Sequence, residues 1–177
     1  EGGGAIIGIG GGTAGFLSRR ELGLTTAGNV TGDSSIAKDT TVAGGTPAGP
    51  PLVSTSAPGG REPEHIPGSI FRSTLDRTHW LTAGYERDHL PVFLDTATPI
   101  KASANGDNPV AFAGTDLLLS GWSWPGNTER AVQNSVYAAV ESVGRGRVVL
   151  FASNPVFRAF WRGPAKLLTN AVLVGPR

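Results

Sequence analysis

The sequence predicts an α/β domain, and three stretches carry that prediction. Ala5–Ile9 is a short apolar run of the kind found in buried strands. A glycine turn and a helical pattern follow it, which gives the β–turn–α unit of open parallel sheets. Near the other end, residues 135–151 have the pattern of a β-hairpin, and an amphipathic helix begins after Gly163-Pro164.

The first β–turn–α unit is defined by its apolar strand and its helix signals. Because the strand is apolar throughout, we expect Ala5–Ile9 to lie in the centre of the sheet. Gly10-Gly11-Gly12 forms a tight turn, and Thr13 is placed to cap a helix over Ala14–Leu22 that Gly23 would end. The unit therefore predicts a buried strand with a helix packed on one face of the sheet.

The next segment changes in composition. Residues 25–66 are rich in Thr, Gly, Ser, Ala and Pro, with few side chains that would enter a core. Such a composition favours a flexible insertion or loop, and we expect residues 28–62 to be the least ordered part of the chain.

Ordered elements return after Pro67. Alternation predicts a strand over Ser69–Leu75, and short strands and helical turns are expected at Trp80-Leu81 (helical), Leu90–Leu94 (strand), Pro109–Phe112 (strand) and Asp116–Ser120 (helical). Pro91 and Pro109 place their strands at sheet edges or at strand starts, because proline donates no ladder hydrogen bond.

The C-terminal third carries the clearest patterns. Alternating residues over Ser135–Val143, a turn at Gly144-Arg145-Gly146 and the apolar run Arg147–Phe151 predict a hairpin toward one edge of the sheet. The final helix has proline at its first position and ends at Gly175-Pro176. Its apolar stripe comprises Leu167, Leu168, Ala171 and Val172.

Composition limits the classes of function. The chain has the 177 residues of one domain, and its net charge of +1 does not favour nucleic-acid binding. No apolar run approaches the roughly 20 residues of a membrane-spanning helix, so no membrane partner is expected. The absence of cysteine excludes a thiolate nucleophile or a cysteine-ligated metal. The opening at Glu1-Gly2-Gly3-Gly4, without Met, predicts that the sequence starts inside a larger polypeptide.

Several runs from Pro67 onward are distinctive in composition. They are Pro67–Arg72, Leu75–His79 with Ala83-Gly84-Tyr85, Leu119–Trp122 with Trp124–Arg130, Gly144–Phe151, and Asn154–Gly163. In these runs the sequence resembles the C-terminal amidotransferase-like domain that follows the peptidase domain of some bacterial zinc carboxypeptidases of the carboxypeptidase A type. The resemblance covers about two-thirds of the chain; residues 1–23 fit it less specifically.

This resemblance implies a flavodoxin-like, class I glutamine amidotransferase fold with a mainly parallel sheet that is truncated at its N-terminus. Residues 1–177 would form one domain at the C-terminal end of a larger zinc metallocarboxypeptidase-type protein. The partner would be the peptidase domain of that parent, which would hold the zinc upstream of this chain. The resemblance also implies export to the periplasm or beyond the cell.

The chemistry of active amidotransferases is missing from the corresponding positions. Active members place a Cys on the turn after a central strand, and a His and a Glu after a later strand, because an amide carbonyl requires an activated thiolate. Here those positions read Gly10-Gly11-Gly12 and Ser153-Asn154-Pro155. We therefore expect no catalytic residue, no cofactor in this chain and an accessory or docking function.

A glycine motif supports an alternative function. Gly10, Gly12 and Gly15 give the G-x-G-x-x-G pattern between a strand and a helix, as in dinucleotide-binding turns that hold an anion at a helix N-terminus. Asp33 follows at a distance suited to a ribose contact, although it lies at no strand end. The alternatives are a nucleotide- or small-ligand-binding domain and a glycine-rich elbow inherited from an amidotransferase ancestor.

The three histidines do not predict a metal site. His65, His79 and His89 show neither the H-x-x-E nor the H-E-x-x-H spacing of zinc ligands. We expect no metal bound by this chain and interpret these residues as surface or supporting histidines.

Aromatic and cationic residues alternate in the run after Arg147–Phe151. Arg158, Trp161 and Arg162 belong to Phe157–Arg162, and no acidic residue follows Glu141 in the sequence. Arg and Trp are the residue types that most often carry binding energy at interfaces. The run therefore predicts either a docking surface for an acidic partner, or core packing by Phe157 and Phe160 with Arg158 and Arg162 bonded to loop carbonyls.

Overall fold

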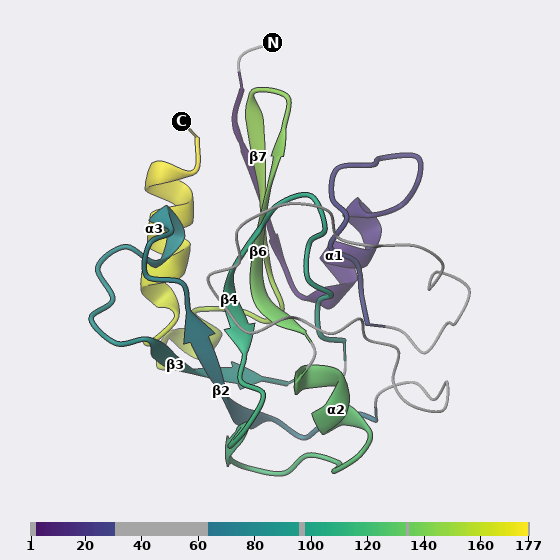
Figure 1. Cartoon of the computed structure of the whole chain (residues 1–177), viewed down its shortest axis with the longest axis vertical. Helices are drawn as coiled ribbons and strands as arrows, with labels where there is room; N and C mark the ends of the chain where they lie inside the picture. Colours follow the sequence, from purple (N-terminus) through teal and green to yellow (C-terminus); the bar gives the residue numbers. More distant parts are fainter. Residues whose placement is uncertain (1–2, 31–63, 96–97, 134, 177) are drawn as a thin grey trace.

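The computed structural model describes residues 3–30, 64–95, 98–133 and 135–176, which form a mixed α/β structure on a curled seven-stranded sheet (Figure 1). The strands are β1 (Ala5–Ile9), β2 (Ser69–Leu75), β3 (His89–Leu94), β4 (Asp107–Phe112), β5 (Leu118–Ser120), β6 (Val136–Val143) and β7 (Gly146–Phe151). The helices are α1 (Gly11–Leu17), α2 (Thr128–Gln133) and α3 (Ala165–Val174), with 3₁₀ turns η2 (Trp80–Thr82) and η3 (Phe157–Ala159). Within the described ranges, no helix has the length and apolarity needed to cross a membrane.

The sheet is mainly antiparallel, so the expected mainly parallel sheet is wrong for the described residues. The order is β1-β7-β6-β4-β2-β3, with β5 paired to β2. β1 and β7 are parallel, and the other five pairings are antiparallel. Parallel neighbours require crossover connections. From β2 onward, most connections between consecutive strands hold no α-helix, which favours antiparallel pairing.

The position of β1 also differs from the prediction. Ala5–Ile9 is a strand as expected, but it lies at one edge of the sheet rather than at its centre. Ile6 is 45% exposed and Ile9 is 40% exposed. The apolar run was interpreted as burial between neighbouring strands, whereas within the described chain β7 is its one strand partner.

The C-terminal hairpin is confirmed. β6 and β7 pair from Ala138 with Phe151 to Val143 with Gly146, next to the edge formed by β1. Both faces of the first part of β6 are buried, because Tyr137, Ala138 and Val140 all belong to the core. The hairpin therefore contributes both of its faces to the core at the start of β6.

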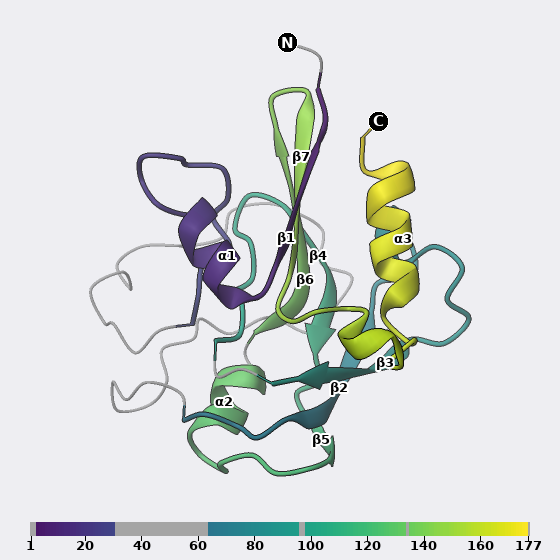
Figure 2. The same ribbon diagram turned by 180° about the vertical axis from the view of Figure 1, so that it is seen from behind.

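Two helices cover opposite faces of the β1 end of the sheet (Figure 2). A side chain on Gly8 would touch Leu17 of α1, whereas a side chain on Gly175, just after α3, would touch Ala5. Residues three apart on a strand lie on opposite faces. Of the predicted apolar stripe of α3, Leu167 and Ala171 are fully buried and Leu168 is partly buried, but Val172 is exposed.

Three local predictions require correction. α1 begins at Gly11 and ends at Leu17, and the Thr13 hydroxyl donates to the carbonyl of Ile9 instead of capping the helix. Asp116–Ser120 was expected to be helical. Asp116 instead has a φ of 46°, and Leu118–Ser120 forms β5, because pairing with β2 outweighs the local preference.

Proline positions are partly as expected. β3, which contains Pro91, lies at the edge opposite β1. β4, which contains Pro109, is an inner strand, and its register with β6 shifts between Asp107 and Val110. A bulge accommodates a residue without an N–H group.

Most of the predicted insertion, residues 31–63, and with it Asp33, lies outside the described residues. The two flanks of that segment are packed. Ala27 and Val30 precede it and Ile66 follows it, and all three are buried.

Candidate docking site

The segment after β7 is fixed to the β3 edge of the sheet. Ser153 is buried, and its hydroxyl donates to the carbonyl of Phe93 over 2.5 Å. The Phe157 ring packs on the Phe93 ring with centroids 4.3 Å apart. The Asn154 side chain accepts the Val156 amide over 3.0 Å, which closes a local turn. The base of the segment is therefore rigid, and Ser153 is not presented as a nucleophile.

Beyond this base, the backbone adopts a strained conformation. Arg158 (φ 49°, ψ 25°) and Ala159 (φ 58°) are two successive non-glycine residues in the left-handed region. Each such residue costs about 1–2 kcal/mol, and this kind of strain is concentrated at functional sites. The consequence here is a sharp turn that directs the next residues outward.

That turn exposes an aromatic side chain between two arginines. Phe160 is 64% exposed, and Arg158 and Arg162 are exposed on either side of it. Trp161 is only half-buried, but its indole Nε1 is shielded from solvent and has no hydrogen-bond acceptor among the described residues. We call Phe157–Arg162 the docking loop. It combines strain, exposed apolar surface and an unsatisfied donor.

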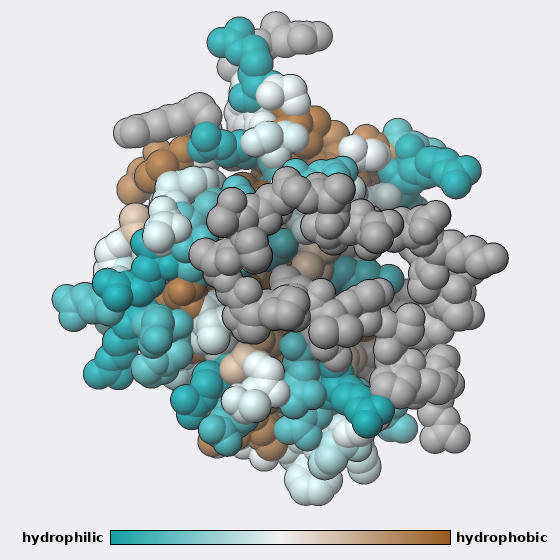
Figure 3. All heavy atoms as spheres, in the orientation of Figure 1, coloured by the Kyte–Doolittle hydropathy of each residue, from teal (hydrophilic) through white to brown (hydrophobic). Residues whose placement is uncertain are grey.

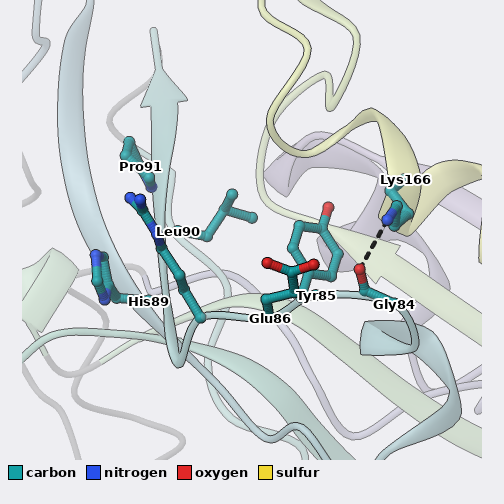
Figure 4. A pocket seen from close by; sticks show the side chains of 8 residues that line it. Gly84, Tyr85, Glu86, His89, Leu90, Pro91 and Lys166 are labelled. Carbon is teal, nitrogen blue, oxygen red and sulfur yellow. Dashed lines mark hydrogen bonds between the residues drawn. The ribbon is translucent and has the colours of Figure 1, made fainter.

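A shallow cleft of about 400 Å³ adjoins the end of the docking loop (Figure 4). Its lining includes Tyr85, Glu86, Arg87, His89, Leu90 and Lys166. The Tyr85 hydroxyl donates to the carbonyl of Gly163 over 2.7 Å, and the Lys166 ammonium donates to that of Gly84 over 2.7 Å. Burial raises the pKa of Tyr85 to about 12, so it remains a donor at neutral pH.

The charge around the docking loop is positive. Arg158 and Arg162 are exposed within the loop. Arg87 and Lys166 line the adjoining cleft together with the acidic Glu86. Arg147, by contrast, has a structural role. Its guanidinium donates to the carbonyls of Val174 and Gly175 at the end of α3 and lies 5.3 Å from the centre of the Trp80 ring.

The glycine turn is packed by protein at Gly11 and Gly15. A side chain on Gly11 would collide with the carbonyl oxygen of Thr98, and one on Gly15 would come within 2.7 Å of the Asn29 amide. Neither Gly10, Gly12 nor Gly15 lines the cleft beside the docking loop or the second cleft near the hairpin tip. Of the three glycines of the predicted anion-binding turn, Gly15 is therefore packed against Asn29, whereas a side chain on Gly10 or Gly12 would have open space around it.

The histidines are not brought together. His79 caps η2, with Nδ1 accepting the Leu81 amide over 3.1 Å and Nε2 lying 3.5 Å from the Asp107 carboxylate. His89 pairs with Asp88 at the surface, and the carbonyl of His65 accepts the Trp124 indole. The described part of the chain contains no cluster of three His, Cys, Asp or Glu residues suited to a metal ion.

The sequence interpretation missed a buried carboxylate. Glu141 on β6 is 6% exposed, and its Oε1 accepts from the hydroxyls of Thr25, Thr26 and Ser103 and from the amides of Thr26 and Ala27, over 2.6–3.2 Å. Burial raises the pKa of this carboxyl, but the hydrogen bonds outweigh burial and hold the pKa below its usual value. The sequence feature that could have predicted this buried carboxylate is an acidic residue within a mostly apolar strand. We call this arrangement the Glu141 clamp.

The comparisons with known proteins found no match. No family model, curated protein or solved structure matches the chain.

Proposed function

We propose that this chain is a non-catalytic, amidotransferase-like accessory domain that docks on the peptidase domain of a zinc carboxypeptidase-type parent protein. The observation that carries the docking part is the docking loop, which exposes Phe160 between Arg158 and Arg162 on a strained backbone. The parent's identity and the likeness to an amidotransferase domain rest on the sequence resemblance alone, since the sheet is mainly antiparallel.

The physical basis is that strained backbone residues cluster at functional sites, and the docking loop places two of them beside an exposed aromatic side chain. On docking, Phe160 would lose its contact with water. Arg158 and Arg162 favour an acidic partner surface, so the association should weaken as salt rises.

The chemistry of the corresponding amidotransferase positions supports a role without catalysis. The chain contains no cysteine, and Ser153 is buried with its hydroxyl bonded to Phe93. Neither of the two clefts described above is lined by Gly10, Gly12 or Gly15, which favours docking over a ligand pocket at that turn.

The first test reads the coding sequence upstream of Glu1 for the ligands of a zinc carboxypeptidase. If it encodes them, binding between that peptidase domain and this chain is measured by calorimetry. We expect Phe160→Ala to weaken binding roughly 30-fold, as for a central interface residue. Trp122→Ala, which removes an aromatic residue of similar exposure (56%), is the matched control.

A second variant separates interface from support. In Arg158→Ala with Trp161→Ala, the isolated chain should keep most of its stability while docking weakens. An upstream sequence without peptidase ligands would refute the parent. Equal effects of Phe160→Ala and Trp122→Ala on binding would refute the loop, and so would unfolding of the double variant.

A further inference from the structure

The two edges of the sheet differ in how they are protected from pairing with other chains. At one edge, β3 carries Pro91, and the segment after β7 contacts it through Phe157, which packs on Phe93. Proline and covering segments are devices that prevent a strand edge from adding a further strand. β1, at the opposite edge, carries neither a proline nor a charge.

The outward backbone groups of β1 form a symmetric set. The hydrogen bonds from Arg147 N–H to the Gly4 carbonyl and from Gly10 N–H to the Phe151 carbonyl flank the parallel ladder with β7. Since alternate residues of a strand direct their backbone groups to the same side, Ala5, Ile7 and Ile9 direct theirs to the outer edge, where the Ile9 carbonyl also accepts the Thr13 hydroxyl. No strand of the described chain pairs with that edge.

Apolar side chains flank the same edge. Ile6 and Ile9 are exposed on β1, and Phe16 is 52% exposed on the neighbouring helix α1. Val172 and Leu173 are exposed on the last turn of α3, which meets β1 at Ala5. Figure 3 shows apolar surface (brown) at this end of α3 and between the hairpin and α1.

We propose that the β1 edge is a dimer interface, at which a second copy of this chain adds its own β1 in antiparallel orientation. A two-fold axis at Ile7 would pair Ile7 with Ile7 of the second copy and Ala5 with Ile9. The three outward-facing residues are symmetric about Ile7, so the edge is complementary to itself.

Charge and area both favour a second copy as the occupant. The β1 strand carries no charge, so two copies of it pair without repulsion, and Arg19 lies beside the patch, 5.5 Å from the centre of the Phe16 ring. At about 175 Å² for each fully exposed residue of this size, the five exposed fractions leave roughly 450 Å² of surface per copy. That is more than half of the roughly 800 Å² per partner of a standard interface, before the β1 backbone is added.

The ends of β1 also allow the close approach that this pairing requires. In the same register, Gly4 of one copy lies opposite Gly10 of the other, and a side chain on either would have open space around it. A cleft of about 430 Å³ beside Gly3–Ile6 gives room for the start of the second copy's α1.

The test is the mass of the chain in solution, measured by light scattering across a dilution series. We expect a dimer that Ile6→Lys converts to a folded monomer, as judged by circular dichroism. Phe160→Lys, the same change at a more exposed position near the opposite edge, should leave the dimer intact. A wild-type monomer throughout the series would overturn the proposal, as would a dimer that Ile6→Lys does not weaken.

The register has its own test, because the chain has no cysteine. Antiparallel pairing at Ile7 would bring its two copies to about 5.5 Å between Cα atoms, within disulfide reach. The Ile6 positions would lie beyond it. Ile7→Cys should therefore form an intermolecular disulfide under mild oxidation, and Ile6→Cys should not, although Ile6 is the more exposed residue. If Ile6→Cys formed the intermolecular disulfide faster than Ile7→Cys, the proposed register would be wrong. This result does not depend on whether Ile6→Lys folds.

Discussion

Replacing Glu141 by alanine should destabilise the protein more than any surface substitution, because one carboxylate joins three parts of the chain. Its Oε1 bonds β6 to Thr25–Ala27 and to Ser103. A carboxylate oxygen has two lone-pair directions, so about two of the five contacts count at full strength. At about 1.5–3 kcal/mol for each bond to a charged group, and with the amides of Thr26 and Ala27 left unpaired, the expected loss is about 3–5 kcal/mol.

The assay is urea unfolding followed by circular dichroism. Glu141→Gln keeps the shape and an acceptor oxygen, so it should lose only about 1–2 kcal/mol. Glu86→Gln, at an exposed position, should change stability by less than about 0.5 kcal/mol.

The same variants predict a pH dependence. Because the folded pKa of Glu141 lies below its unfolded value, the clamp is fully stabilising above the usual carboxyl pKa and is lost as pH falls through the folded value. The difference in stability between wild type and Glu141→Gln should therefore shrink in acid. A loss below about 1 kcal/mol in Glu141→Ala at neutral pH would refute the view that the clamp supports the fold.

Three further predictions concern individual residues. Burial lowers the pKa of His79, against the raising effects of Asp107 and nearby acids, so stability is complete above about pH 6.5 and falls below it; an NMR titration that places its pKa above the usual value would contradict this. Ala159→Gly relieves a φ of 58° and should stabilise by about 0.5–1 kcal/mol, whereas Ala14→Gly, inside α1, should destabilise by about 1 kcal/mol; urea midpoints that shift in the same direction would contradict the strain. Arg147→Ala removes the contacts to the α3 carbonyls and the Trp80 ring, and should lower the unfolding free energy by about 1–2 kcal/mol; unchanged thermal unfolding would contradict that role.

Local sequence patterns predicted which strands and helices form better than they predicted which of them lie side by side in the sheet. The hairpin followed from alternation and a glycine turn, since both are properties of contiguous sequence. The edge position of Ala5–Ile9 did not follow, because an apolar strand has the same composition whether another strand covers it or not.

The candidate site was predictable only in part. Arg158, Trp161 and Arg162 were predicted from their residue types. The exposure of Phe160 depends on two residues with left-handed backbone conformation, and neither is a glycine, so the sequence does not reveal that turn. The Glu141 clamp joins residues more than 100 positions apart in the sequence, which local patterns do not reveal.

The parallel pairing of β1 with β7 has a consequence for the order in which the chain folds. Ala5 pairs with Arg147 and Ile9 with Phe151, so about 140 residues separate the partners. During synthesis β1 is therefore made about 140 residues before its neighbour in the sheet, β7. Contacts this distant in sequence form slowly, since the entropy of closing the long loop is lost before the pairing stabilises it. Until β7 has been synthesised, β1 remains an unpaired, uncharged apolar segment. Unpaired apolar segments of this kind favour aggregation of the nascent chain.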